Sequence, residues 1–279
     1  MNNLTDDYKK LYDLYKKFGS GEDLNVVFYS TNQPVPYKDL FIYPVKTIYY
    51  MFFHSLAECF FVNKYDSGLA ECMGMNPLQF LFYQDLSKKI DNANNYLPRL
   101  EFLLLMCLQK PEIDNSGEKT IKFIEKGKKQ LISIDGKLYD WKDFEKMRDI
   151  ICEQNCIELP DWKIHPDIRK KLKEKDELMA RINKRKIASF EELIDCLMLA
   201  SGYTEEYILN LSIRRFTNLL RRYDIMKNYE LMTILSPNME KKDRDNILSW
   251  NSAIPKQDQY FSKVTNLAEI EKKVNGINK

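Results

Sequence analysis

The spacing of apolar and polar residues is most informative between residues 189 and 235, where it predicts three helices separated by two tight breaks. Ser189 is followed three residues later by Glu192, which is the pattern of a capping box. Gly202 stands where the first helix should end, and Thr204 and Ser212 are candidate N-caps for the next two helices. The apolar positions at single-face spacing are Leu193, Ile194, Leu197 and Met198, then Tyr207, Ile208 and Leu211, then Phe216, Leu219, Leu220, Tyr223 and Met226. Residues 188–235 are therefore predicted to form a C-terminal three-helix module.

The pattern over residues 1–115 predicts a helical lobe with one short pair of strands. Residues 5–18 carry an amphipathic helical pattern that is followed by two glycines. Residues 24–30 and 39–43 are rich in β-forming types and are separated by prolines, which favours a strand pair. From residue 45 to residue 62 the pattern is helical and apolar on nearly every side, as expected of a helix in the middle of a bundle. Two further helix starts are marked by proline, at Asn76-Pro77 and at Pro98.

A β-hairpin followed by a helix is predicted for residues 116–162. Residues 121–125 and 130–134 can pair as strands, and Asp135-Gly136 between apolar runs is the strongest short hairpin signal in the chain. Asp140 is then in place to cap a helix with an apolar face. The whole pattern predicts a mainly α protein made of helical-bundle lobes, with small β-hairpins as its minor β content.

Two segments are expected to lie outside these lobes. Residues 163–187 carry ten basic and four acidic side chains with only a thin apolar stripe, which predicts a largely exposed basic helix that bridges two lobes. Residues 236–279 have too little apolar content for a core and are predicted to be a mobile tail, with one short helix near residues 267–274.

Composition narrows the classes of function. The 279 residues include 43 basic and 41 acidic side chains, so the net charge of +2 argues against nucleic-acid binding through bulk charge. The six cysteines are scattered, mostly inside apolar runs, and the first residues are polar without a secretory signal, so we expect a reducing cytoplasm. The most apolar segments, residues 40–62 and 97–108, are interrupted by polar residues or too short to cross a membrane, and are predicted to be core.

No arrangement of residues predicts a reaction centre. His54 lies in an apolar helical pattern, where a packed core role is favoured, and His165 lies in a polar segment without a partnering motif. Cys152, Cys156 and His165 could supply three zinc ligands, but no second close cysteine pair supplies a fourth. The glycine-rich phosphate motifs and the HExxH pattern are also missing from the sequence. We therefore expect no catalytic, cofactor-binding or metal-binding residues, and no enzyme.

Four arginines lie opposite the apolar stripe of the last predicted helix, at Arg214, Arg215, Arg221 and Arg222. One interpretation is a helix-turn-helix regulator that reads DNA with residues 212–224. The other is a solvated or protein-facing surface, balanced by nearby acidic residues. The second interpretation predicts that replacing all four arginines by alanine leaves folding nearly intact, because exposed charges each contribute little.

Three segments carry a resemblance to a known family: KDLFIYPVKTIYYMFF, NPLQFLFYQDL and FEELIDCLMLASGYTEEYILNLSIRRFTNLLRRYD. Over about a third of the chain, they resemble the tail assembly chaperones of bacteriophages that infect low-GC Gram-positive bacteria. The resemblance implies a non-enzymatic morphogenesis factor in the host cell cytoplasm that binds the tape measure protein and helps tail tube protein assemble around it. It implies a partner-binding role for the three-helix module, without implying a membrane, a nucleic acid or a cofactor.

The side chains expected to contact a partner are adaptable apolar and cationic groups of the module. They are Tyr203, Tyr207, Arg214, Arg215, Arg221, Arg222, Tyr223 and Met226. Two other functions stay open from the sequence: the DNA-binding regulator, and a structural tail or baseplate component that is retained in the virion. The sequence also leaves the oligomeric state open.

Overall fold

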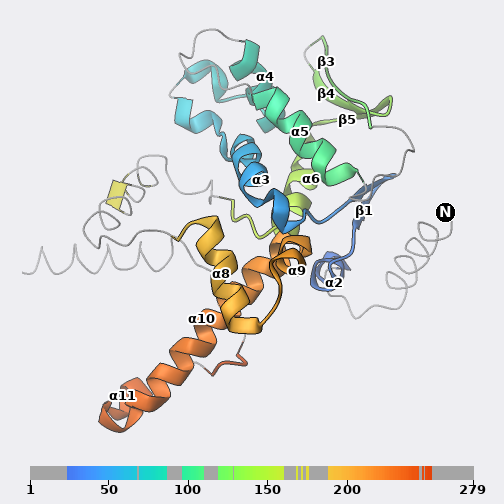
Figure 1. Cartoon of the computed structure of the whole chain (residues 1–279). Helices are drawn as coiled ribbons and strands as arrows, with labels where there is room; N and C mark the ends of the chain where they lie inside the picture. The colour runs from blue at the N-terminus through green and yellow to red at the C-terminus, as the bar shows by residue number, and fades with distance from the viewer. Residues whose placement is uncertain are drawn as a thin grey trace, which may run out of the picture. The chain divides into compact units, whose positions relative to one another are not determined.

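The computed structural model of the chain describes residues 24–67, 69–86, 96–109, 119–127, 129–159 and 188–244, together with the shorter pieces 168, 171, 174–175, 247 and 249–252. The chain divides into two compact units. The first comprises residues 1–160 and 203–217, and the second comprises residues 161–202 and 218–279. As predicted, the described residues are mainly α-helical, with two small antiparallel sheets (Figure 1).

The first unit contains helices and two small antiparallel sheets. Its α-helices are α2 (Leu24–Thr31), α3 (Tyr50–Ala57), α4 (Pro77–Leu86), α5 (Tyr96–Leu108), α6 (Trp141–Gln154), α9 (Glu205–Asn210) and the start of α10 (Ile213–Leu235). Its short 3-10 helices are η1 (Thr47–Tyr49), η2 (Glu58–Phe61), η3 (Lys64–Ser67) and η4 (Ala70–Cys72). Its strands are β1 (Val35–Tyr37), β2 (Leu40–Ile42), β3 (Ile121–Lys126), β4 (Lys129–Ile134) and β5 (Lys137–Tyr139).

The strand pair predicted near the start of the chain forms with different residues. Residues 24–30 are not a strand: they lie within α2, which packs beside α6 and β1 and buries Phe28 and Tyr29. The pair is made by β1 and β2, with Val35 opposite Ile42 and a tight turn in which Lys38 has a φ of 52°. The prediction was wrong because β propensity is weak, and packing of the aromatic side chains against α6 overrides it.

The second sheet confirms the predicted hairpin. β3 and β4 pair in antiparallel register, with Ile121 opposite Ile134, and β4 continues into β5. The turn between β4 and β5 is Asp135-Gly136, and both residues have positive φ, at 51° and 80°. Two left-handed residues in a two-residue loop match the twist of the strands they connect, which is why an Asp-Gly pair is strongly preferred there.

Most predicted helix starts are confirmed by their hydrogen bonds. The Asp140 carboxylate accepts from the Asp143 N–H at 3.0 Å, and the Asp143 carboxylate accepts in return from the Asp140 N–H at 3.2 Å. Asn76 and Gln79 form the same reciprocal pair at α4. The predicted start at Pro98 is too late: α5 already includes Tyr96, and the Tyr96 and Leu97 N–H groups donate to the Asp85 carboxylate at the end of α4. Each bond satisfies a helix N–H group that would otherwise have no partner in the helix.

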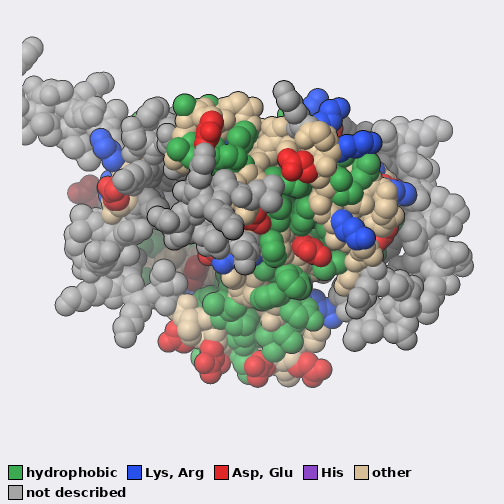
Figure 2. All heavy atoms as spheres, turned by 90° about the horizontal axis from the view of Figure 1, so that it is seen from above, with side chains coloured by type: hydrophobic (Ala, Val, Ile, Leu, Met, Phe, Trp, Pro, Cys, Tyr) green, Lys and Arg blue, Asp and Glu red, His purple; other side chains and the backbone are tan. Residues whose placement is uncertain are grey.

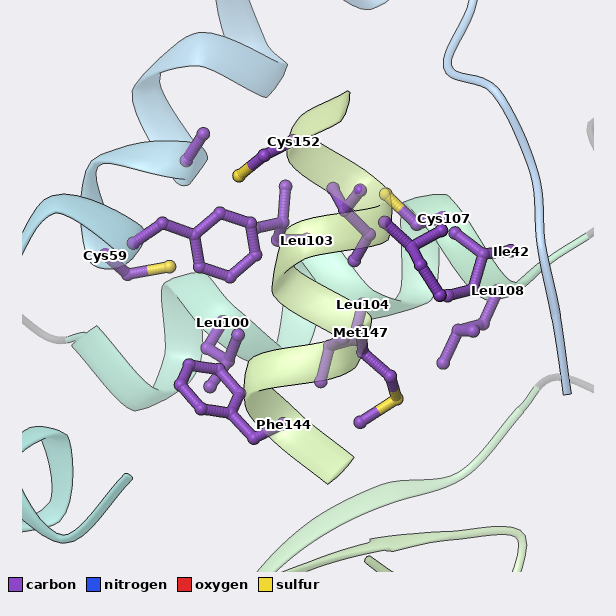
Figure 3. Packing of buried hydrophobic residues seen from close by; sticks show 14 of the residues in the cluster. Ile42, Cys59, Leu100, Leu103, Leu104, Cys107, Leu108, Phe144, Met147 and Cys152 are labelled. Carbon is purple, nitrogen blue, oxygen red and sulfur yellow. The ribbon is translucent and has the colours of Figure 1, made fainter. Parts of the chain in front are cut away.

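The core of the first unit lies where α5 and α6 pack together with the hairpin of β1 and β2 and with the segment around η2. Figure 3 shows this packing, in which side chains of α5 and α6 point toward one another. The residues labelled there are Ile42, Cys59, Leu100, Leu103, Leu104, Cys107, Leu108, Phe144, Met147 and Cys152, and each is buried. The prediction that residues 97–108 are core is therefore confirmed for the inward face of α5.

The segment from residue 45 to residue 62 departs from its prediction in two ways. It breaks into η1, α3 and η2 instead of forming one helix. It also does not lie in the middle of a bundle, since Met51 is 63% exposed and Phe52 is 52% exposed, whereas Phe53 is fully buried. The buried face packs against α5, and the opposite face is left open to solvent.

The three helices predicted for residues 188–235 are confirmed as α8 (Phe190–Ser201), α9 and α10. The Ser189 hydroxyl accepts from the Glu192 N–H in a capping box, Gly202 is left-handed with a φ of 70°, and Thr204 caps α9. The Ser212 hydroxyl accepts from the Arg215 N–H at the start of α10.

The second unit contains α8, the part of α10 after residue 217, η5 (Ser236–Asn238) and α11 (Lys241–Arg244). The predicted helices over residues 5–18 and 267–274 lie outside the described residues. The same holds for most of the basic segment 163–187 and for the tail beyond residue 252.

Candidate functional site

The eight side chains predicted to bind a partner fall in both units. Tyr203, Tyr207, Arg214 and Arg215 belong to the first unit, and Arg221, Arg222, Tyr223 and Met226 belong to the second. The division comes from the backbone of residues 211–213, which pairs with residues 45–47 of the first unit.

That backbone pairing joins segments more than 160 residues apart. The Thr47 N–H donates to the Leu211 carbonyl at 2.7 Å, and the Ile213 N–H donates to the Val45 carbonyl at 2.8 Å. The Thr47 hydroxyl donates to the same Leu211 carbonyl at 2.9 Å. These bonds satisfy backbone groups at the entry to α10 and hold α9 beside η1.

Arg214 is bound inside the first unit and does not extend freely from it. Its Nη1 donates to the Glu153 carbonyl at 2.6 Å and lies 3.6 Å from the Glu153 carboxylate. The guanidinium also lies 5.5 Å from the ring centroid of Tyr29, at a distance suited to a cation–π contact. Arg214 therefore differs from the exposed charge assumed for the four-arginine replacement, because its charged hydrogen bond ties α10 to the end of α6.

Arg222 plays a comparable part in the second unit. Its Nη1 donates to the carbonyls of Trp250 and Ser252, at 2.7 Å each. The contact fixes residues 249–252 against α10. Arg215, by contrast, is exposed, and Arg221 is half-buried. Two of the four arginines thus make the hydrogen bonds described above, and Arg215 is the most exposed of the four.

Tyr203 and Tyr207 form an exposed aromatic pair at the start of α9. Their ring centroids are 4.6 Å apart, and both side chains are more than a third exposed. Glu205 and Glu206, between them in sequence, are exposed as well. The two predicted tyrosines therefore do lie together at an acidic surface.

In the second unit, Tyr223 and Met226 are half-buried. The ammonium group of Lys227 lies 5.7 Å from the centroid of the Tyr223 ring. The helix becomes much more open after them. Leu231, Met232, Ile234 and Leu235 are all exposed, with Ile234 at 74%. We call these four side chains the α10 end.

The partner-binding side chains predicted from the sequence end at Met226 and do not include the α10 end. In the sequence these positions have the i, i+1, i+3, i+4 spacing of one side of a helix, so the pattern alone does not show whether that side is buried or exposed. Figure 2 shows that hydrophobic side chains reach the surface of the described residues in groups, one of them bordered by acidic side chains at the lower edge of the view.

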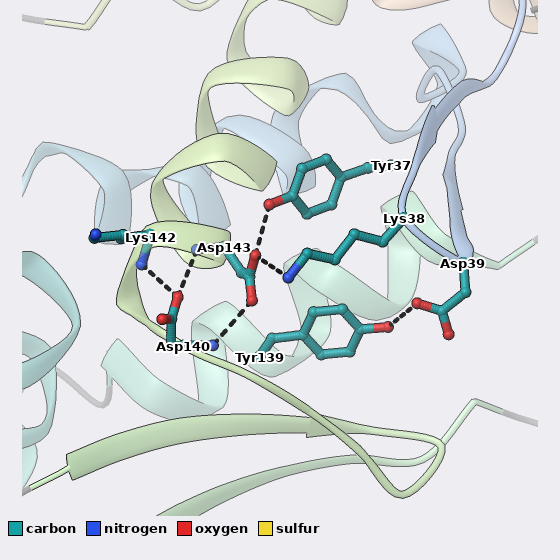
Figure 4. Close-up of polar contacts among 7 residues, drawn as sticks. All are labelled: Tyr37, Lys38, Asp39, Tyr139, Asp140, Lys142 and Asp143. Carbon is teal, nitrogen blue, oxygen red and sulfur yellow. Dashed lines mark hydrogen bonds and ion pairs between the residues drawn. The ribbon is translucent and has the colours of Figure 1, made fainter.

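A polar network in the first unit was also missed. The Tyr37 hydroxyl donates to the Asp143 carboxylate at 2.7 Å, and the Lys38 ammonium binds the same oxygen at 2.5 Å (Figure 4). The Tyr139 hydroxyl donates to the Asp39 carboxylate at 2.7 Å, which also binds Lys137. The network connects the turn after β1 to the start of α6 and to β5, so its members come from positions about 100 residues apart.

The electrostatics of the network favour charged carboxylates. Hydrogen bonds from Lys137 and Tyr139 lower the pKa of Asp39 to about 2. Burial of Asp143 opposes its ionisation, but hydrogen bonds from Lys38 and Tyr37 outweigh that effect and hold its pKa below the usual value. The pKa values of Tyr37 and Tyr139 are raised, first by burial and then by the carboxylates they bind. The donors and acceptors of these side chains bind one another, as expected of contacts that stabilise the fold by joining β1, β5 and α6.

Burial shifts the pKa values of three cysteines and of His54 in the first unit toward their neutral forms. Burial raises the pKa of Cys59 to about 12 and also raises the pKa of Cys107 and of Cys152. Burial lowers the pKa of His54, whose ring packs 4.4 Å from that of Tyr50. A packed role for His54, as expected from the sequence, fits this environment.

The candidate zinc ligands do not form a described site. Cys152 is buried in the core and Cys156 is half-buried beyond the end of α6, while His165 lies outside the described residues. Among the residues that the structure describes, no three His, Cys, Asp or Glu side chains are placed to hold a metal ion. Over the same residues, no helix is both long enough and apolar enough to span a membrane.

Comparison with known proteins gives one match. Residues 182–254 match a phage-derived family described as the YomV second domain. The matched range covers α8, α9 and α10, and it is consistent with a phage protein. No curated protein and no solved structure matches the chain.

Proposed function

We propose that this protein is a non-enzymatic phage tail morphogenesis factor, which binds the tape measure protein in the host cytoplasm and assists assembly of the tail tube. The observation that carries the proposal is the α10 end, where four apolar side chains project from one helix into solvent. Exposed apolar groups gathered at one place are typical of protein-binding surfaces. The match to a phage-derived family over residues 182–254 includes this helix and supports a phage setting.

The α10 end suits a long helical client. Leucine, isoleucine and methionine side chains can pack into the grooves of an amphipathic helix, and methionine adapts its shape to different partners. Burying such side chains contributes roughly 25 cal/mol for each Å² of apolar surface removed from water. A client whose own apolar stripe would otherwise aggregate is therefore stabilised by the same contact that holds it.

The start of α10 argues for protein binding over DNA recognition. A recognition helix presents the residues of its N-terminal part to the base edges in the major groove. Here Ile213 and the residues just before it pair with residues 45–47, and Arg214 is bound to Glu153. These groups are occupied within the first unit, which supports a role in which α10 uses its far end.

The proposal is tested by affinity capture of the tagged chain from cells that are producing the encoding phage. We expect the tape measure protein among the captured proteins, and we expect the combined change Leu231→Ser and Ile234→Ser to reduce its yield about tenfold or more, as for loss of two apolar anchors. Asn228→Ser, at an exposed polar position on the same helix, is the matched control and should leave the yield unchanged.

Two results would contradict the proposal. Capture without any tail protein would remove the tail morphogenesis role. Presence of the chain in purified finished particles, in a fixed ratio to tail tube protein, would instead support a structural tail or baseplate component. Absence from finished particles together with capture of the tape measure protein during assembly is the expected combination.

A further inference from the structure

A second group of exposed apolar side chains lies in the first unit, away from the α10 end in the chain. It contains Ile48 and Tyr49 of η1, Met51 and Phe52 of α3, and Tyr203 and Tyr207 at α9. We call this group the η1–α9 surface. Ile48 is 56% exposed, and the other five range from 41% to 63%.

The two halves of this group lie on segments that pack together, although they are about 150 residues apart in sequence. η1 and α9 pack directly against each other. The backbone bond from Thr47 to Leu211 fixes their register, and the Lys46 ammonium donates to the Asn210 side chain at 3.2 Å. The aromatic and aliphatic side chains of both segments are therefore presented by one folded body.

The surface is also held in a defined shape. Thr47, Phe53 and Ile208, which lie just beneath it in sequence and structure, are fully buried. Thr204 caps α9 by accepting from the Tyr207 N–H. A surface whose supporting side chains are already packed loses little conformational entropy when it binds.

Acidic groups mark the ends of this surface. Glu205 and Glu206 are exposed in the first turn of α9, and Glu58 is exposed just after α3. Glu58 is paired with Arg99 at 2.7 Å, whereas Lys46 binds the neutral Asn210 side chain and keeps its positive charge at the last residue of α9. Among the described residues, the first turn of α9 therefore carries two negative charges, those of Glu205 and Glu206.

We propose that the η1–α9 surface binds an amphipathic helix of a partner protein, whose apolar face covers Tyr49, Phe52 and Tyr207 and whose flanking Lys or Arg residues meet Glu205 and Glu206. Aromatic side chains are frequent energetic anchors in such interfaces. Opposite charges at the rim set the orientation of the helix and speed its association. The inference concerns a different surface from the α10 end and does not require the partner to be a tail protein.

The test uses the full chain and two designed 18-residue peptides. Both peptides carry leucines at helical spacing; one has lysine at the remaining positions, and the other has glutamate there. Binding is measured by fluorescence anisotropy of the labelled peptides at two salt concentrations. We expect the lysine peptide to bind at least about tenfold more tightly than the glutamate peptide, and this preference to shrink at high salt.

Three variants locate the binding. Phe52→Ser should weaken binding of the lysine peptide by about tenfold, as for loss of an aromatic anchor. The double change Glu205→Lys and Glu206→Lys should invert the preference between the two peptides. Leu138→Ser is the matched control, because Leu138 is as exposed as Phe52 but lies on β5. It should leave both affinities unchanged, and thermal melts should show that all three variants are folded.

The occupant is identified by replacing Phe52 with photoreactive p-benzoylphenylalanine. Cross-linking to the lysine peptide supports the proposal. Cross-linking to a second copy of the chain, or to another segment of the same chain that the peptide fails to displace, would overturn it. Equal affinity for the two peptides, or no effect of Phe52→Ser, would overturn it as well. None of these outcomes bears on capture of the tape measure protein through the α10 end.

Discussion

Two apolar stretches of the first unit look alike in sequence and are used differently in the structure. α5 buries Leu100, Leu103, Leu104, Cys107 and Leu108 between α3 and the rest of the core. The stretch formed by η1 and α3 buries one face and exposes the other, with Ile48, Tyr49, Met51 and Phe52 at the surface. Both stretches were predicted to be core from the same pattern.

The difference shows what apolar content does and does not establish. Contact between apolar side chains and water is unfavourable, so covering an apolar face lowers the free energy of the folded protein. α5 is covered because other elements of its own unit pack on it, whereas the open face of α3 is not covered by them. The η1–α9 surface and the α10 end share this property: each has apolar side chains that the described residues of its own unit leave exposed.

The neighbouring residues Phe52 and Phe53 of α3 lie on its open and buried faces, so their replacement should have the most different effects on stability. Phe53 is fully buried, so Phe53→Ala should lower the free energy of unfolding by about 3–5 kcal/mol through lost burial and a residual cavity. Phe52 is half exposed, so Phe52→Ala should change it by no more than about 0.5 kcal/mol. Urea denaturation of the two variants measures both values. Similar losses for the two positions would mean that the open face is covered in solution.

Local features were predicted from the sequence because their causes are local. The capping box at Ser189, the left-handed Gly202, and the Asp135-Gly136 turn each depend on hydrogen bonds or φ values within four residues. The cap at Asp140 has the same character. Such signals are read directly from residue types at fixed spacing.

Long-range features could not be predicted in the same way. The pairing of residues 45–47 with 211–213 has no sequence motif, because backbone groups of any residues can make it. It nevertheless decides that α9 belongs to the first unit. The contact between Asp39 and Tyr139 is likewise set by how two hairpins meet. For the site, the sequence identified the tyrosine pair but not the surface formed with η1, since that surface exists only after the pairing.

The hydrogen bonds of Asp143 stabilise the first unit by polar contacts, in contrast to the apolar packing of Phe53. Asp143→Asn should lower the free energy of unfolding at pH 7 by about 1–3 kcal/mol, because charged hydrogen bonds from Tyr37 and Lys38 are weakened. Asp140→Ser is a matched control that retains a capping oxygen at the start of α6 without changing the Tyr37 and Lys38 contacts. Chemical denaturation at pH 7 compares the two variants.

The same network predicts how stability depends on pH. The pKa values of Asp39 and Asp143 are lower in the folded state than the ordinary aspartate value of about 3.9. Their contribution is therefore present above that value and is lost as the pH falls below it. The stability difference between wild type and Asp143→Asn should accordingly shrink between pH 5 and pH 3 (roughly the window set by the ordinary value). A difference that stays constant over this range would show that the carboxylate charge is not what stabilises the link.

Replacing the neighbouring residues Arg214 and Arg215 of α10 should have smaller effects on stability, and the two effects should differ. Arg214→Ala should cost about 1.5 kcal/mol, because the Glu153 carbonyl loses a charged donor and Tyr29 loses its cation contact. Arg215→Ala should change stability by no more than about 0.5 kcal/mol, since its side chain is exposed. Thermal unfolding of the two single variants separates them. Equal, negligible effects would restore the view of both as surface charges.

Thiol labelling tests the packing of α5 without changing its residues. Cys107 lies fully buried on the inward face of α5, and burial raises its pKa, so it should react only when the core opens. Cys196 is exposed on α8 and should be labelled at the rate of a free thiol. With an opening free energy of about 4 kcal/mol or more, Cys107 should react on the order of a thousandfold more slowly. If mass spectrometry showed both sites labelled at similar rates, α5 would be no better covered than the open face of α3, and the contrast between the two stretches would disappear.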